Sequence, residues 1–204
     1  VPAGYVFAIW SIIFIGWIAF SVYQFLPAQK ESPRLRNLGY FFAISGIFNA
    51  TWLVCWHYNL FGLSVLVMLT LLALLIVSYI KLNVGLTTVT AAERWSVDVP
   101  FSVYLGWISV ATVANISSWL YFVNWNGFGI APQAWAVIMI AIASVLGVLI
   151  TLTRRDSGYV FVLAWAFAGI AVKQALVPLV ANAAWGAVIL ALGLATYSII
   201  ARRR

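Results

Sequence analysis

The chain has 204 residues, of which 65% are hydrophobic and only 7% are charged, and its mean hydropathy is +1.07. Soluble domains carry about a quarter charged residues, and a soluble core at this length cannot absorb so much apolar surface. The composition therefore excludes a soluble globular protein. The net charge of +7 does not indicate a nucleic-acid partner, because the basic residues lie in loops and at the C-terminus, beside apolar runs.

Seven apolar runs are long enough to be transmembrane helices, whereas strands of a membrane barrel would alternate over about ten residues. The predicted helices are Tyr5–Leu26, Asn37–His57, Phe61–Leu82, Asp98–Tyr121, Gln133–Thr153, Gly158–Gln174 and Val177–Ala201. We expect an all-α, polytopic transmembrane helical bundle in which residues 1–204 form a single transmembrane domain.

The distribution of basic residues predicts how the bundle is oriented. With seven helices, only Lys173 falls on one side of the membrane. The other ten of the eleven basic residues fall on the opposite side: Lys30, Arg34, Arg36, Lys81, Arg94, Arg154, Arg155, Arg202, Arg203 and Arg204. Because cytoplasmic loops are enriched in Lys and Arg, we expect the N-terminus outside and the C-terminus in the cytoplasm, in a bacterial cytoplasmic membrane.

The run Asp98–Tyr121 carries a polar and aromatic stripe. Its members recur at three- and four-residue steps and so share one helix face: Tyr104, Trp107, Ala111, Asn115 and Ser118. An asparagine amide is costly against lipid, so this face should look inward. It can line a ligand pocket, or it can simply pack helices through small residues and an Asn bridge. Both interpretations stay open at this point.

Aromatic residues are in excess, with 11 Trp, 9 Tyr and 13 Phe. Some suit the interfacial belts of any membrane protein, but others step along single helix faces. The latter are Phe7, Trp10, Phe14 and Trp17 on the first helix, Asn49, Trp52 and Trp56 on the second, and Trp107 and Trp119 on the fourth. Such faces can build a cage for a flat, largely apolar ligand, or they can fill a core.

Groups that usually perform chemistry are scarce. All four acidic residues lie in loops or at a helix mouth, and no phosphate-binding loop or catalytic triad pattern is present. His57 has no partner side chain for a metal site, and it is either an interfacial histidine near Trp56 or an axial haem ligand. The single Cys55 forms neither a disulfide nor a CxxC site. Lys173 either snorkels to the interface or pairs with a ligand carboxylate. The sequence thus predicts no catalytic and no metal-ligating residues, which favours binding over catalysis.

Three motifs resemble those of the tryptophan-rich sensory protein and translocator family, also called the peripheral benzodiazepine receptor family. Trp107-x-x-x-Ala111-Thr112-x-x-Asn115 is similar to its WxxxATxLN pattern, and Asn49-Ala-Thr-Trp52 to its NxxW motif. Pro2-Ala-Gly-Tyr-Val-Phe7-Ala-Ile-Trp10 is similar to its PPxWxFxxVW motif, with one proline in place of two and a shorter gap. The motifs keep the family's order over about residues 1–121.

The resemblance implies a translocator-like core in residues 1–122, three additional helices in 123–204, and an eighth helix upstream of Val1. It also implies a pocket between helices that binds porphyrins and, in relatives, sterols and synthetic drugs. Carried over by motif, Trp10, Asn49, Trp52, Trp107, Ala111 and Asn115 would line or shape this pocket. From the aromatic faces we add Phe7, Trp56, Tyr104 and Trp119, and we expect the site in the outer half of the bundle.

The expected function is that of an integral membrane binding protein, a sensor or carrier for a tetrapyrrole-like or other flat hydrophobic molecule. The alternatives are a porphyrin-degrading membrane enzyme and a structural subunit of a larger membrane complex. We expect no required cofactor, a porphyrin or haem-like ligand at most, and a lipid bilayer as the surroundings. The sequence leaves a homodimer open.

Overall fold

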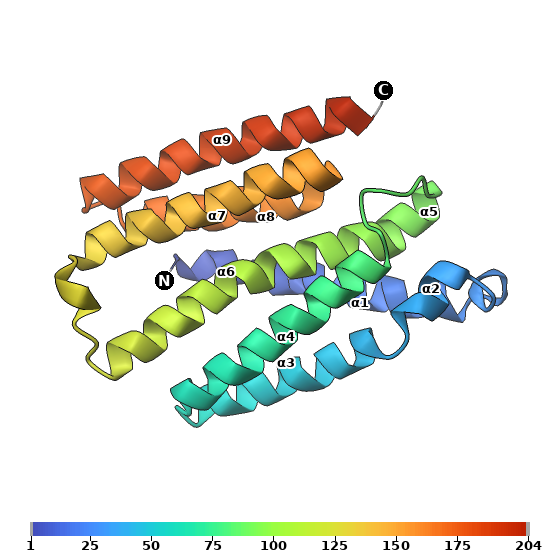
Figure 1. Cartoon of the computed structure of the whole chain (residues 1–204), viewed down its shortest axis with the longest axis horizontal. Coiled ribbons are helices and arrows are strands. Elements are labelled where there is room, and N and C mark those ends of the chain that lie inside the picture. The colour runs from blue at the N-terminus through green and yellow to red at the C-terminus, as the bar shows by residue number, and fades with distance from the viewer. Residues whose placement is uncertain (1, 203–204) are drawn as a thin grey trace. The chain divides into compact units, whose positions relative to one another are not determined.

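The computed structural model describes residues 2–202, and within that range it is helical, with turns and without strands (Figure 1). Among the described residues, five helices are long and apolar enough to cross a membrane: Gly4–Phe25, Phe61–Lys81, Ala91–Phe122, Pro132–Arg154 and Pro178–Ala201. Two further apolar helices, Phe41–His57 and Ser157–Lys173, have 17 residues each, about the lower limit for a span. The all-helical membrane architecture is confirmed, with an apolar helix at each predicted place.

Contacts divide the chain into two compact units. Unit 1 combines Val1–Ile9 with Asn124–Arg204, and unit 2 is Trp10–Val123. The terminal residues Val1, Arg203 and Arg204, on which part of the orientation prediction rests, lie outside the described residues. The expectation of a single domain remains a prediction.

Unit 2 contains most of the aromatic residues singled out in the sequence. Its helices, of which the first begins one residue earlier in unit 1, are α1 (Ile9–Phe25), η2 (Pro27–Gln29), α2 (Pro33–Leu38), α3 (Phe41–His57), α4 (Phe61–Lys81), α5 (Ala91–Glu93), the π-helix η3 (Arg94–Asp98) and α6 (Val99–Phe122). The short turn after α3 makes α3 and α4 antiparallel neighbours, and α4 also packs on α6. Met68, Leu71 and Leu75 of α4 are fully buried, so this side of α4 belongs to the core of the unit.

Two helix boundaries in unit 2 differ from the sequence prediction. The second apolar helix begins at Phe41 and not at Asn37, because Gly39 has a φ of 57° and ends α2; side chains other than glycine rarely adopt this conformation. The helix that leads into α6 begins at Ala91, seven residues before the predicted start. Thr90 caps this start, since its side chain accepts a hydrogen bond from the Glu93 backbone N–H at 3.2 Å.

A π-turn connects α5 to α6. The N–H of Val99 donates to the C=O of Arg94, five residues back, in place of the four-residue step of an α-helix. Pro100 gives a physical reason, because it has no N–H to donate to residue 96, and its ring would press on that carbonyl in a regular α-helix. A wider turn at this point relieves the contact.

Unit 1 contains η1 (Gly4–Ala8), η4 (Gly127–Gly129), α7 (Pro132–Arg154), α8 (Ser157–Lys173) and α9 (Pro178–Arg202). The helices α7, α8 and α9 lie side by side (Figure 1). Ala184, Ala191 and Ala195 of α9 are almost fully buried, and their small side chains let α9 approach α8 closely. Asp156 caps α8 by accepting from the N–H groups of Gly158 and Tyr159 at 2.9 and 3.3 Å.

The N-terminal segment η1, which carries the proline motif, is held by α8. The Ala3 N–H donates to the Gly169 carbonyl at 3.0 Å, and the Trp165 indole N–H donates to the Val6 carbonyl at 2.9 Å. The rings of Tyr5 and Trp165 meet edge to face, with centroids 5.3 Å apart. Val6 is completely buried. The last three helices therefore include the partner of the N-terminal motif.

Candidate functional site

Four large aromatic side chains meet inside unit 2, and we call them the aromatic cluster: Trp10 of α1, Trp52 of α3, and Tyr104 and Trp107 of α6. The Trp10 ring lies at the centre, with its centroid 6.4 Å from each of the other three. Trp10 stacks on Trp52 and meets Tyr104 and Trp107 edge to face. Three helices thus contribute flat faces to one place, in geometries that favour aromatic contacts.

Further rings extend the aromatic cluster in two directions. Trp17 of α1 meets Tyr104 edge to face at 5.0 Å, and Phe14 lies between Trp10 and Trp17. On α3, Trp56 lies 5.9 Å from Trp52 and 5.1 Å from the Phe61 ring of α4. From Trp10 onward, the aromatic faces predicted on the first and second helices are therefore parts of one continuous assembly.

An amide network borders the aromatic cluster. Asn115 Oδ1 accepts a hydrogen bond from the Trp52 indole N–H at 3.4 Å and lies 3.2 Å from the Ser64 hydroxyl. Asn115 and Ser64 are 2% and 0% exposed. Ser64 lies on α4, which the sequence interpretation did not include in the site. The available signal was a serine within an otherwise apolar membrane helix, since such residues usually face the bundle interior.

Several buried polar atoms near these rings have no hydrogen-bond partner among the described residues: Trp17 Nε1, Asn49 Oδ1, Tyr104 Oη and Asn115 Nδ2. Buried polar groups in proteins are nearly always hydrogen-bonded, to protein, water or ligand. Asn49 lies one helical turn from Trp52 and is 4% exposed. The aromatic interior thus offers donors and an acceptor, and none of the side chains named so far in the cluster or its network is charged.

The remaining predicted residues are placed differently. Ala111 is half-buried on α6 between Trp107 and Asn115. Trp119 of the same helix approaches Gly62 of α4: a Cβ added to Gly62 would lie 3.3 Å from the indole nitrogen of Trp119. Trp56 is 37% exposed. Phe7 is 45% exposed and belongs to η1 in unit 1, so its assignment to the site stays a prediction.

A cluster of charged residues lies at one end of unit 2, and we call it the Arg34 clasp. The Arg34 guanidinium donates to the Leu82 carbonyl at 2.6 Å, to the Glu93 carboxylate at 2.6 Å and to the Asp98 carboxylate. Burial acts to lower the pKa of Arg34, but hydrogen bonds and charge interactions with Asp98 and Glu93 outweigh it and hold the pKa above its ordinary value. This guanidinium is therefore charged at every physiological pH, and the clasp does not depend on its titration.

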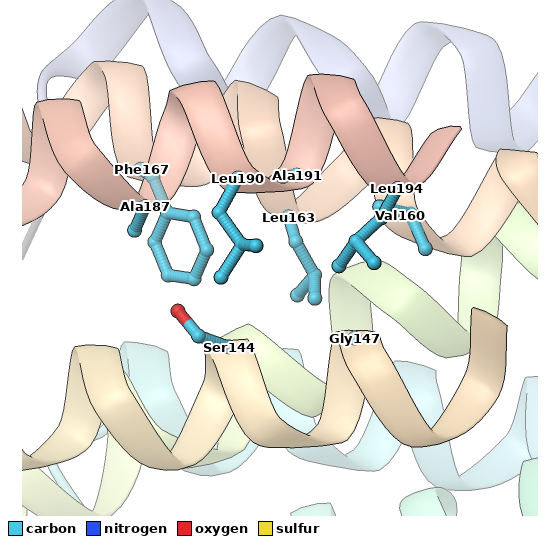
Figure 2. Close-up of a pocket in the computed structure, with 9 residues that line it drawn as sticks. All are labelled: Ser144, Gly147, Val160, Leu163, Phe167, Ala187, Leu190, Ala191 and Leu194. Atoms are coloured by element: carbon cyan, nitrogen blue, oxygen red, sulfur yellow. The ribbon is translucent and has the colours of Figure 1, made fainter. Parts of the chain in front are cut away.

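A narrow crevice runs between α7, α8 and α9 in unit 1 (Figure 2). Ser144 and Gly147 of α7 face Phe167 and Leu163 of α8 across it, with α9 alongside. It is lined almost wholly by apolar atoms and is too narrow to hold a water molecule. It is a seam of helix packing and not a ligand site.

Side chains that can bind metals do not form a cluster in the part of the chain that the structure describes. No group of three or more His, Cys, Asp or Glu side chains that could hold a metal ion occurs in residues 2–202. His57 is exposed and lies against the ring of Tyr58. Lys173 is exposed at the end of α8.

One family model, described as TSPO-like protein, matches residues 1–197. The match extends through α7, α8 and most of α9, well beyond the residues 1–121 over which the three motifs carry the resemblance. The last helices are therefore included in the family pattern. No curated protein and no solved structure matches the chain. Residues 2–202 contain seven apolar helices and a cluster of tryptophan rings, as a helical membrane protein of this kind requires. Because the family model matches residues 1–197, the chain belongs to the family of TSPO-like membrane proteins.

Proposed function

We propose that this membrane protein binds a flat, largely hydrophobic small molecule of tetrapyrrole-like shape, as a sensor or carrier. The binding site is the interior of unit 2, around the aromatic cluster. The observation that carries the proposal is the combination of stacked rings from three helices with buried polar atoms that lack a partner. Apolar walls with a few polar handles are the usual chemistry of a small-molecule site.

The same chemistry supports binding over catalysis. A catalytic site needs a nucleophile or an acid–base pair within reach of the substrate. The cluster supplies ring faces, amide groups, a phenol and indole N–H groups, with no carboxylate, histidine or lysine among them. The part of the ligand that enters the cluster is uncharged, because an unpaired charge is costly in such surroundings. Any carboxylates of a tetrapyrrole would remain outside it.

Incubation of the purified protein with protoporphyrin, in light and in darkness, tests the proposal. We expect saturable, stoichiometric binding with a porphyrin absorption spectrum that does not change over time. Light-dependent conversion to a bilin-like spectrum would contradict the proposed binding function and show that the protein is a porphyrin-degrading enzyme. No affinity for protoporphyrin, together with co-purification of other membrane proteins, would favour a structural subunit and contradict the proposal.

Replacing Ala111 by phenylalanine should lower protoporphyrin affinity by at least about tenfold, or about 1.4 kcal/mol. Ala111 lies on α6 between Trp107 and Asn115 and is half-buried, so a large side chain there would occupy the space that the ligand needs. The measurement is a fluorescence titration with the porphyrin, beside thermal unfolding in detergent. Ser117→Phe on the exposed face of the same helix is the matched control and should bind normally. A variant Ala111→Phe that unfolds easily but retains full affinity would show a packed face without a pocket.

The orientation of the chain is also proposed, with the C-terminus in the cytoplasm. Contacts within unit 2 support it, because the Arg34 clasp and the bond from Asn37 Nδ2 to the Lys81 carbonyl at 3.2 Å bring several basic segments to one end. In unit 1, Arg155 donates to the Ala201 carbonyl at 3.1 Å, so its turn lies beside the end of α9. A reporter enzyme fused after residue 204 should be active only if it functions in the cytoplasm. Activity of a reporter that requires export would contradict this orientation.

A further inference from the structure

The Arg34 clasp joins three segments that are far apart in sequence. Its acceptors are the carbonyl of Leu82 after α4, the carboxylate of Glu93 in α5, and the carboxylate of Asp98 at the end of the π-turn. The side chains of Arg34, Glu93 and Asp98 are 15%, 18% and 6% exposed. Removing one partner of a partly buried, hydrogen-bonded ion pair strongly destabilises a protein, because the remaining charge loses its partner. The largely exposed ion pair of Arg36 with Glu31 contributes little by comparison.

The spacing of the two carboxylates depends on the π-turn. Glu93 and Asp98 are five residues apart. In an α-helix, five residues turn the chain so that the two side chains point about 140° apart. In a π-helix, hydrogen bonds join residues five apart, which therefore lie one above the other on the same face. One guanidinium can hold both carboxylates only because residues 94–98 form a π-turn.

Residues 94–98 could also form an α-helix, and this alternative conformation is close in free energy to the π-turn. A π-turn contains one residue more than a turn of α-helix, and π-helical turns are rare in proteins compared with α-helical ones. Pro100 weakens the α-helical alternative, because it removes one hydrogen bond and its ring presses on the carbonyl of residue 96. The two conformations are thus brought closer in free energy, and the ion pairs of the clasp favour the π form.

We propose that the Arg34 clasp and the π-turn form a conformational latch that closes this end of unit 2. With the clasp formed, residues 94–98 keep the π conformation. When the clasp opens, the segment relaxes to an α-helix, and the residues before it rotate by about 100° and move by about 1.5 Å along the axis. The rotating side is α5, because Ala91 and Ala92 are exposed whereas the first turns of α6 are buried. Opening uncovers Leu82, Val84 and Val97, which are all fully buried.

Distance measurement between two spin labels tests the latch. In a Cys55→Ser background, labels at the exposed positions Tyr40 and Ala92 report on the rotation of α5 against the start of α3. We expect a single distance in the parent protein. Arg34→Ala should add a second, shifted population, and Glu93→Gln should add a smaller one. Arg36→Ala, which breaks the exposed ion pair in the same short segment, should leave the distribution unchanged.

Deletion of Ser96 tests whether the effect of Arg34→Ala comes from opening of the latch or from a general loss of stability. It shortens the spacing of the two carboxylates to four residues, so that an α-helix places both on Arg34 without a π-turn. The deleted protein should fold, and Arg34→Ala should no longer shift the distance in this background. A folded Arg34→Ala protein with an unchanged distribution would overturn the latch. So would a protein that unfolds on deletion of Ser96, or a shift in Arg36→Ala as large as that in Arg34→Ala. If Arg34→Ala does not fold, Glu93→Gln decides in the same way.

Discussion

Replacing Gly169 by alanine should lower the stability of unit 1 by about 1–3 kcal/mol, although alanine is the better helix former. An added Cβ at this position would lie 2.0 Å from Val6 Cγ2 and 3.3 Å from Pro2 Cβ. Val6 is fully buried and branched at Cβ, so it cannot turn away without leaving its place. Thermal unfolding in detergent should show the loss.

Two further variants make this prediction specific. Gly186→Ala changes another glycine of unit 1, whose added Cβ meets nothing within 4 Å, and it should be neutral or slightly stabilising. Val6→Ala, combined with Gly169→Ala, removes the opposing methyl groups and should restore part of the lost stability. Equal unfolding temperatures for Gly169→Ala and Gly186→Ala would show that η1 is not fitted closely against α8.

Replacing Trp52 by alanine should weaken protoporphyrin binding by at least about tenfold. The change removes the ring that stacks on Trp10 at 6.4 Å and lies 5.9 Å from Trp56. It also removes the indole N–H that donates to Asn115 Oδ1. Each aromatic contact is worth about 0.5–1.5 kcal/mol, and the amide of Asn115 loses one of the groups that orient it.

Two control variants divide the Trp52 effect into its parts. Trp52→Phe keeps a ring face but loses the N–H, so it should retain more affinity than Trp52→Ala. Trp185→Ala removes a 47% exposed tryptophan of α9 and should leave porphyrin binding intact. Normal affinity in Trp52→Ala would mean that the ligand does not use this ring, and the aromatic cluster would then be a packed core.

The long apolar helices could be predicted closely from sequence. The run Phe61–Leu82 differs from α4 by one residue at its end, because a bilayer requires a continuous apolar stretch and the polar flanks define its limits. The inward face of α6 was also predictable, since Tyr104, Trp107 and Asn115 are 1–2% exposed. The cost of an amide in lipid leaves few other orientations for this helix.

The features that depend on distant partners could not be predicted. Ser64 lies 51 residues from Asn115, and Arg34 lies 59 and 64 residues from its two carboxylates. No local pattern indicates which partner such a side chain will meet. The helix start at Ala91, in contrast, could have been predicted from a local pattern, because Thr90-Ala-Ala-Glu93 has the spacing of a helix-capping box. This signal was available, but the polar residues around it indicated a loop.

The hydrogen bond between Trp165 and the Val6 carbonyl joins residues 159 positions apart, and this separation affects how the protein is made. During synthesis η1 leaves the ribosome early, whereas α8 follows only after α1, α3, α4, α6 and α7. At about 5–20 residues per second, the delay is on the order of ten seconds. For that time the N-terminal motif has neither its backbone partner Gly169 nor the Trp165 ring. Unit 1 therefore completes its folding last, and a nascent chain that stalls before α8 will carry an unpaired N-terminal segment on an otherwise assembled unit 2.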